Sequence, residues 1–449
     1  MSNFKHIVTW IETHYWAFIV GLFLLTRLFI VFFPTTEYSD VTHYYERYAN
    51  FWRYGMEPYF EHLYEYPPAS VPVLYLPLEL DQRGWGKYYL NYRVETFLIE
   101  SLLFVAMFFT VKKFWPRQEV KRKSLLVYIG LSLLASDWLY EGIDLTFTTT
   151  IFLSYLSILW LEPKKFASKV VFWTLFWLST SIKFLTLPLM VPLYLLTKTD
   201  FKKDLVAVLI GFLLIWGGPI LYFRSALSVS FIYNAGRPLK YSSFPSYMVQ
   251  VANVFTESEI QSTLAPDFEF IGPVSNNVSQ IVKILYPLSI LYVLALSALM
   301  AWKNQHPDEE LRYTPAGLIR LCKWIFQPTN LAPDDRFYLM LRTHALYLFV
   351  TFFTAKIFSQ PYHLWYLPLI ALYPFDRRIW PKIIAAIALM YILDLTSWLA
   401  YPLWFRHWLA NQGVGFEPNV IRDIFRYIPM LGALTYFLTR TPAPALHKS

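Results

Sequence analysis

PTTEYSDVTHYYERYANFWRYGMEPYFEHLYEYPPASVPVLYLPLEL, residues 34–80, is the stretch that decides how this chain is organised. It follows an apolar segment at 15–33 and precedes another at 91–111, so it is a long polar excursion between two membrane spans. Its early part carries the carboxylates Glu37, Asp40, Glu46, Glu57 and Glu61, with aromatic residues packed between them. A plain connecting loop needs none of this, so the stretch indicates chemistry at the membrane surface.

The first half of this loop has the pattern of an amphipathic helix. Between Asp40 and Gly55, aromatic residues recur near the helical period, while His43, Glu46 and Arg47 fall on the opposite side. Such a helix lies in the membrane surface, with its aromatic rings at headgroup depth. The later Tyr66-Pro67-Pro68 run predicts an extended path, because proline fixes its own φ and keeps the preceding residue out of the helical region.

The composition indicates an all-α polytopic membrane protein. Of 449 residues, 56% are hydrophobic and only 16% are charged. The net charge of +8 comes from short basic clusters between apolar segments, so it predicts membrane topology rather than nucleic-acid binding. The single cysteine, Cys322, excludes an intrachain disulfide and a cysteine-based metal site. We interpret 1–449 as one transmembrane domain.

Twelve segments are long enough to cross, or nearly cross, a hydrocarbon core of roughly 30 Å. They lie at 15–33, 91–111, 124–139, 143–161, 168–182, 184–197, 205–223, 281–302, 337–355, 363–375, 382–400 and 424–439. Lysine and arginine clusters in alternate loops mark the cytoplasmic side, which includes the loop 303–336. The loops 34–90 and 224–280 then lie on the opposite side, where the isolated polar residues near span ends gather.

Asp40 and Lys183 are the first candidates for chemistry. Asp40 lies just past the first span, where a carboxylate could take a proton from a hydroxyl held beside the membrane. It could equally cap the helix that follows. Lys183 stands in an apolar run with no carboxylate near it in sequence, so it needs either a distant side chain or a lipid phosphate as its partner.

Two arginines and a histidine complete the candidates on this side. Arg224 and Arg237 open the loop 224–280, where each could bind a phosphodiester or merely contact lipid headgroups. His363 stands at the start of a span and could act as an acid, a base or a sugar-binding donor, or be an ordinary hydrogen-bonded residue. Metal-ligand spacings and a glycine-rich phosphate loop are missing from the sequence, so we expect no metal, nucleotide or other cofactor.

Several short motifs resemble the GT-C superfamily of membrane glycosyltransferases, above all the bacterial polyprenyl-phosphate-mannose-dependent mannosyltransferases. The first loop carries an acidic residue just after span one, followed by Gly55-x-x-Pro58-Tyr59 and Tyr66-Pro67-Pro68. The other matches lie downstream. They are Glu141-Gly142-Ile143-Asp144, Lys183 ahead of Leu187-Pro188, the stretch 233–243 around Arg237, and Pro361-Tyr362-His363 before Trp365-Tyr366-Leu367-Pro368.

The resemblance implies an inverting transfer of a sugar, with mannose expected, from a polyprenyl-phosphate donor to a hydroxyl of a lipid or glycan acceptor. It implies Asp40 as general base and His363 as its assistant, with Lys183, Arg237 and Arg224 on the donor phosphate. Glu37 lies three residues from Asp40, so either carboxylate could be the base. Further substrate contacts are expected from Glu37, His43, Tyr44, Tyr66, Asp144, Tyr233 and Tyr362. The family's usual acidic residue after the loop arginine is replaced here by Tyr241-Ser242.

Three other readings stay open. A non-catalytic membrane scaffold would not need a carboxylate, a lysine, an arginine and a histidine on one face. A GT-C enzyme could use a different polyprenyl-phosphate sugar, such as glucose or arabinofuranose. A transporter or lipid flippase would instead place charges near the middle of its spans and show related halves, whereas this sequence gathers its charges on one rim. The sequence leaves both a bacterial plasma membrane and an endoplasmic reticulum membrane open, and the resemblance favours the bacterial one. The active site is expected on the non-cytoplasmic face, with membrane lipids as partners.

Overall fold

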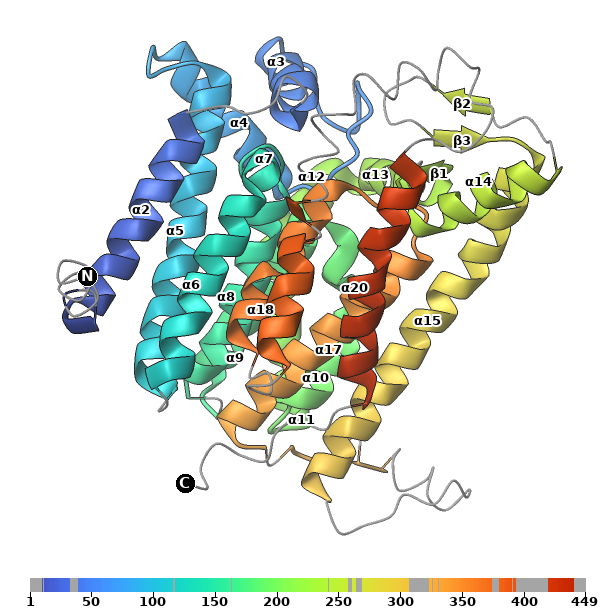
Figure 1. Cartoon of the computed structure of the whole chain (residues 1–449). Helices are drawn as coiled ribbons and strands as arrows, with labels where there is room; N and C mark the ends of the chain where they lie inside the picture. The colour runs from blue at the N-terminus through green and yellow to red at the C-terminus, as the bar shows by residue number, and fades with distance from the viewer. Residues whose placement is uncertain are drawn as a thin grey trace, which may run out of the picture.

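The computed structural model is almost entirely helical (Figure 1). It describes the chain except for residues 1–9, 11, 33–38, 116–117, 163, 241, 257–260, 264–268, 307–322, 325, 330, 374–378, 390, 393–418 and 440–449. Long helices run side by side as a bundle, and shorter elements gather at its upper end in Figure 1. The bundle helices are α2 (Tyr15–Phe32), α5 (Tyr88–Phe114), α6 (Gln118–Leu134), α8 (Asp144–Trp160), α9 (Phe166–Ile182), α10 (Met190–Thr197), α11 (Phe201–Phe212), α15 (Pro273–Gln305), α17 (Pro333–Thr354), α18 (Leu367–Leu372) and α20 (Asn419–Thr439).

Five helical stretches in the described part of the chain are long and apolar enough to cross a membrane. They are Tyr15–Phe32, Tyr88–Phe114, Phe201–Gly236, Pro273–Gln305 and Pro333–Thr354, and shorter apolar helices lie among them. The prediction of an all-α membrane protein is therefore confirmed at this level. The finer count of twelve spans stays a prediction.

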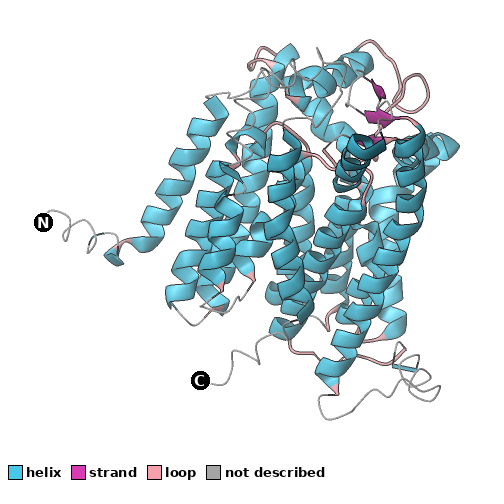
Figure 2. Cartoon of the chain, turned by 45° about the vertical axis from the view of Figure 1, so that its right-hand side comes forward, coloured by secondary structure: helices cyan, strands magenta, loops and turns pink. Residues whose placement is uncertain are grey.

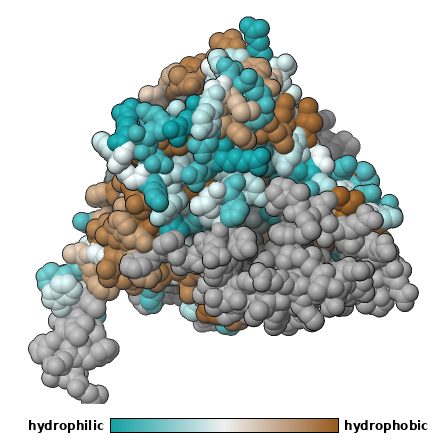
Figure 3. Space-filling model, turned by 90° about the horizontal axis from the view of Figure 1, so that it is seen from above, coloured by the Kyte–Doolittle hydropathy of each residue, from teal (hydrophilic) through white to brown (hydrophobic). Residues whose placement is uncertain are grey.

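The upper end of the bundle carries the elements of the two predicted non-cytoplasmic loops (Figure 1). From the first loop come η1 (Val41–Tyr45), α3 (Glu46–Arg53) and α4 (Ser70–Gln82). From the second come η4 (Arg224–Leu227), α13 (Ser228–Gly236) and α14 (Phe244–Thr256), and α12 (Gly218–Phe223) lies at the end of the predicted span 205–223 before them. The connections are α7 (Ser136–Leu139), η2 (Phe184–Leu189), η3 (Leu213–Gly217) and η5 (Gln360–Tyr366), and a further helix covers Trp380–Leu389. Figure 3, which looks down on this end, shows hydrophilic residues toward the middle and hydrophobic ones at its edges.

A small sheet stands at this end beside α14, where Figure 2 shows the strands in magenta. It has the order β1-β3-β2, with both pairs antiparallel, and comprises β1 (Leu239–Lys240), β2 (Gln261–Thr263) and β3 (Glu269–Ile271). Leu239 pairs with Phe270 and Lys240 with Glu269. The sheet follows Arg237 directly, so it brings β3 alongside that arginine.

The first loop is more helical than the sequence predicted. The helix expected from Asp40 is present and ends before Gly55, which adopts a φ of 83° that glycine tolerates best. The loop then forms a second helix, α4, which the sequence analysis did not predict. It starts two residues after Pro68, and Tyr88 anchors it by donating a hydrogen bond to the carbonyl of Leu74 at 2.9 Å.

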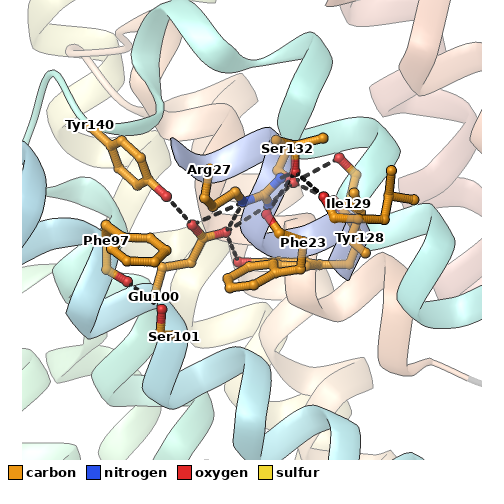
Figure 4. A network of polar contacts seen from close by, with 11 residues as sticks. Phe23, Arg27, Phe97, Glu100, Ser101, Tyr128, Ile129, Ser132 and Tyr140 are labelled. Carbon is orange, nitrogen blue, oxygen red and sulfur yellow. Dashed lines mark hydrogen bonds and ion pairs between the residues drawn. The ribbon is translucent and has the colours of Figure 1, made fainter. Parts of the chain in front are cut away.

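A buried ion pair ties α2 to α5 inside the bundle (Figure 4). The Arg27 guanidinium donates to the Glu100 carboxylate at 2.8–3.1 Å, and both side chains are fully buried. Tyr128 and Tyr140 donate to the same carboxylate at 2.8 and 2.5 Å. Glu100 lies midway along α5, so this pair lies away from the rim on which the sequence analysis placed nearly all isolated polar residues near span ends. Because Tyr140 directly precedes Glu141-Gly142-Ile143-Asp144, the network holds the start of that segment in place.

Candidate functional site

The centre of the site is an ion pair between the ends of two bundle helices. Lys183 follows α9, and Asp144 opens α8. The Lys183 Nζ lies 2.6 Å from the Asp144 Oδ1, with the two side chains 19% and 5% exposed. Trp365 Nε1 donates to the same oxygen at 2.6 Å. The predicted distant partner of Lys183 is thus Asp144, which the sequence analysis had treated as a substrate contact.

Aromatic rings surround the lysine. Tyr362 and Trp365 stack with ring centroids 3.9 Å apart, and the Lys183 Nζ lies 4.2 and 4.8 Å from those centroids. A cation held over π faces and against a carboxylate is strongly positioned. These contacts therefore hold the ammonium group of Lys183 in one position, and Lys183 lines the cavity described below.

Asp40 approaches the same centre from the first loop. A Cβ built on Gly142 would lie 3.4 Å from the Asp144 Oδ2 and 3.8 Å from the Asp40 Oδ2. The two carboxylates therefore flank the bare backbone of Gly142, and a large side chain at that position would intrude between them. Asp40 is half-buried and also interacts electrostatically with Lys183.

Tyr45 links Asp40 to this backbone. Its hydroxyl accepts a hydrogen bond from the Ile143 N–H at 3.2 Å and lies 3.4 Å from the Tyr66 hydroxyl. Burial, followed by the nearby Asp40 carboxylate, raises the pKa of Tyr45 well above its usual value. The phenol therefore stays protonated at neutral pH and can donate a hydrogen bond.

Hydrogen bonds to backbone carbonyls hold the residues on both sides of Tyr66-Pro67-Pro68 near Lys183. The Ala69 N–H donates to the Ser181 carbonyl at 2.9 Å, two residues before Lys183. The side-chain Nδ2 of Asn234 on α13 donates to the Glu65 carbonyl at 2.9 Å. The first loop, the end of α9 and the second loop are thereby joined around one space.

Arg237 closes this space from the second loop. Its Nε lies 2.8 Å from the Glu269 Oε1 of β3, and its Nη1 lies 3.7 Å from the Glu65 Oε2. The guanidinium also lies over the ring of Tyr233, 5.6 Å from its centroid. Lys356 holds the arginine's backbone, because its Nζ donates to the Arg237 carbonyl at 2.7 Å.

These segments enclose a cavity of about 530 Å³. Its charged lining includes four basic residues, Lys183, Arg237, Lys283 and Lys356, and the acidic Glu65. Its apolar wall includes Phe184, Leu185, Phe231, Val282, Pro287 and Phe352 from η2, α13, α15 and α17. A space lined by both basic and apolar side chains can hold an amphipathic molecule that carries a phosphate next to a hydrocarbon chain.

The structure brings some of the predicted residues to this cavity and leaves others away from it. Lys183, Arg237, Tyr66 and Tyr362 line it. Asp40, Asp144 and Tyr233 are not among its described lining residues. Asp144 pairs with Lys183, which lines the cavity, and Asp40 interacts electrostatically with the same lysine. The ring of Tyr233 lies under the guanidinium of Arg237, another lining residue. Glu37 lies outside the described residues.

Four predicted residues lie elsewhere. His363 is fully buried, with its Nδ1 2.8 Å from the Tyr366 hydroxyl and its ring packed against Phe358. Arg224 is exposed after α12 with a positive φ of 51°. His43 is exposed on η1 and bonded to the Ser39 carbonyl, and Tyr44 is half-buried beside it. The structure does not place these side chains in the cavity wall.

Other residues of the site were missed from the sequence. Glu65, Glu269, Lys356 and Trp365 all contact predicted site residues. Glu65 stands directly before Tyr66-Pro67-Pro68, which was a usable signal. The sequence analysis found no acidic residue directly after Arg237. Glu269, 32 residues further along the chain, supplies a carboxylate to this arginine. Only the short sheet brings it there.

Comparison of the chain with protein-family models, curated proteins and solved structures gives no match in any of the three. The class of protein therefore follows from the fold alone: it is an all-α protein with membrane-spanning helices.

Proposed function

We propose that the protein is an inverting glycosyltransferase of the GT-C type, which moves a sugar, with mannose expected, from a polyprenyl-phosphate donor to a hydroxyl of a lipid or glycan acceptor. Asp40 is the general base. The observation that carries the proposal is the meeting of the Asp40 and Asp144 carboxylates at Gly142, beside Lys183 and the cavity it lines.

The chemistry requires one base and a way to stabilise a departing phosphate. The acceptor O–H gives its proton to Asp40 while its oxygen forms a bond to the anomeric carbon, and the bond from that carbon to the phosphate oxygen breaks. The lipid phosphate leaves with the bonding electron pair. Lys183 and Arg237 neutralise the charge that develops on it.

The two carboxylates then have different roles. Asp144 is held by Lys183 and Trp365, and it positions the lysine. The Asp40 carboxylate and the Tyr45 hydroxyl both lie close to Gly142, which has no side chain of its own. Arg237 makes one short ion pair with Glu269 and a longer one with Glu65, so a phosphate would replace Glu65 more readily than Glu269.

The donor and location also remain parts of this proposal. The basic and apolar side chains that line the cavity together favour a lipid phosphate over a free sugar nucleotide. The proposed location is a bacterial plasma membrane with this end of the bundle on the non-cytoplasmic face. Polyprenyl-phosphate glucose or arabinofuranose would use the same contacts.

The test is to incubate the purified protein with radiolabelled polyprenyl-phosphate mannose, glucose or arabinofuranose and a lipid extract. We expect a new labelled glycolipid or glycan with the mannosyl donor. Arg237→Gln should lower transfer at least about tenfold, the effect of one lost charged contact to the phosphate. Arg224→Gln, at an exposed site away from the cavity, is the matched control.

A lipid flippase is the second candidate, because the Arg27–Glu100 pair is a charge pair within spans of the kind that transporters use. This pair is fully buried and hydrogen-bonded on both sides, which suits a structural role better. Reconstitution in vesicles separates the two functions. Movement of labelled donor across the bilayer without any new glycosylated product would favour the flippase and contradict the transferase.

A further inference from the structure

A second large cavity runs along α6, whose described residues do not line the cavity of the candidate site. It is a groove of about 720 Å³ between α6 and the helix Trp380–Leu389. On α6 its lining runs from Lys123 to Leu134, and on the other helix from Trp380 to Ala388. The residues between these ends are apolar, for example Leu126, Val127, Gly130 and Ile384. This is within the range of about 300–1,000 Å³ that small-molecule sites occupy.

The groove has the length of one membrane leaflet. Eleven residues separate Lys123 from Leu134 on α6, which corresponds to about 16 Å along a helix. Half of a hydrocarbon core of roughly 30 Å is about 15 Å. The apolar part of the groove therefore matches the depth of the acyl chains in a single leaflet.

The polar groups of the groove stand together at one end. Lys123 and Trp380 each begin the lining on their helix. The Trp380 Nε1 is buried and has no hydrogen-bond partner among the described residues. A buried N–H without an acceptor costs free energy, so an acceptor from outside the chain would stabilise it. Lys123 continues the basic run Lys121-Arg122-Lys123, which marks the cytoplasmic side.

We propose that this groove binds one anionic glycerophospholipid of the cytoplasmic leaflet. An ester or phosphate oxygen of the lipid accepts from Trp380 Nε1, the Lys123 ammonium lies against the headgroup phosphate, and an acyl chain fills the space beside Gly130. Charge complementarity favours an anionic headgroup, because a basic side chain near the surface attracts anionic lipids. The site is independent of the proposed transfer reaction.

The test uses the full chain in phosphatidylcholine nanodiscs with a phosphatidylglycerol probe that carries a photoreactive diazirine on its acyl chain. We expect crosslinks in the α6 peptide containing Gly130 and in the helix Trp380–Leu389. Unlabelled phosphatidylglycerol should compete better than phosphatidylcholine. Lys123→Gln should weaken labelling about fivefold, and Trp380→Phe should weaken it by a similar factor.

The sharpest variant fills the groove. A Cβ on Gly130 meets nothing within 4 Å, and Gly130 lines the groove, so the side chain of Gly130→Leu would take up part of that space and we expect at least tenfold less labelling. Gly21 on α2 also has open space around its Cβ and does not line the groove, so Gly21→Leu is the matched control. Equal labelling of the Gly130→Leu and Gly21→Leu variants would overturn the proposal. Equal competition by the two lipids, or crosslinks only elsewhere in the chain, would also overturn it.

Discussion

Replacing Asp144 by asparagine should destabilise the protein, because it leaves the Lys183 ammonium without its carboxylate. The lost contact is an ion pair of 2.6 Å between side chains that are 5% and 19% exposed. Removing one partner of a buried pair costs about 3–5 kcal/mol. Since Lys183 is partly exposed and keeps the faces of Tyr362 and Trp365, we expect about 2–3 kcal/mol.

A double-mutant cycle isolates the pair itself. Lys183→Met leaves Asp144 with the hydrogen bond from Trp365, and the double variant removes both charges. Unfolding by SDS in mixed micelles, followed by tryptophan fluorescence, gives the free energy of unfolding of each variant. We expect the double variant to be more stable than the sum of the single changes predicts, with a coupling energy of at least about 1 kcal/mol. A coupling energy below about 0.5 kcal/mol would refute the ion pair as the organising contact of the site.

Three further variants test the fold by the same unfolding measurement. Glu100→Gln should lower the free energy of unfolding by about 3–5 kcal/mol, because Arg27 is fully buried with it. Glu79→Gln, in a partly exposed pair with Arg83, should cause no measurable change, and equal effects of the two changes would contradict the buried network. Gly211→Ala should lower the free energy of unfolding by about 1–3 kcal/mol, because the new Cβ would lie 2.8 Å from the backbone of α9. A Cβ at Gly217 meets nothing within 4 Å, so Gly217→Ala is the control and should leave the free energy of unfolding unchanged. Tyr45→Phe should cost about 1 kcal/mol for its lost hydrogen bonds and lower the proposed transfer, and unchanged values of both would contradict its role beside Asp40.

The helices could be predicted because apolar runs are local signals. The predicted segments 15–33, 143–161 and 168–182 correspond within about two residues to α2, α8 and α9. The small sheet could not be predicted, since its strands are two or three residues long and carry no alternating pattern. The helix α4 was missed because proline-rich runs argue against helix, whereas here the helix begins after Pro67-Pro68 and tolerates Pro77 within it.

The site could be predicted in part, because isolated charges in apolar surroundings must have partners. That argument found Lys183 and Arg237, but it could not name Asp144 or Glu269, which are 39 and 32 residues away in the sequence. It also gave His363 and Arg224 roles that depend on where a side chain points. His363 is buried among aromatic rings, and Arg224 is exposed after α12. Both outcomes are set by tertiary packing, which cannot be read from a linear sequence pattern.

The most direct test of the proposed transferase compares Asp40→Asn with the wild type in the radiolabelled transfer assay. Glu57→Gln is the matched control, since Glu57 is an exposed carboxylate of the same loop whose side chain accepts a hydrogen bond from Tyr222. We expect Asp40→Asn to lower the transfer rate at least about a hundredfold, as loss of a general base does, with Glu57→Gln close to wild type. An Asp40→Asn protein that transfers the sugar at the wild-type rate would contradict the account.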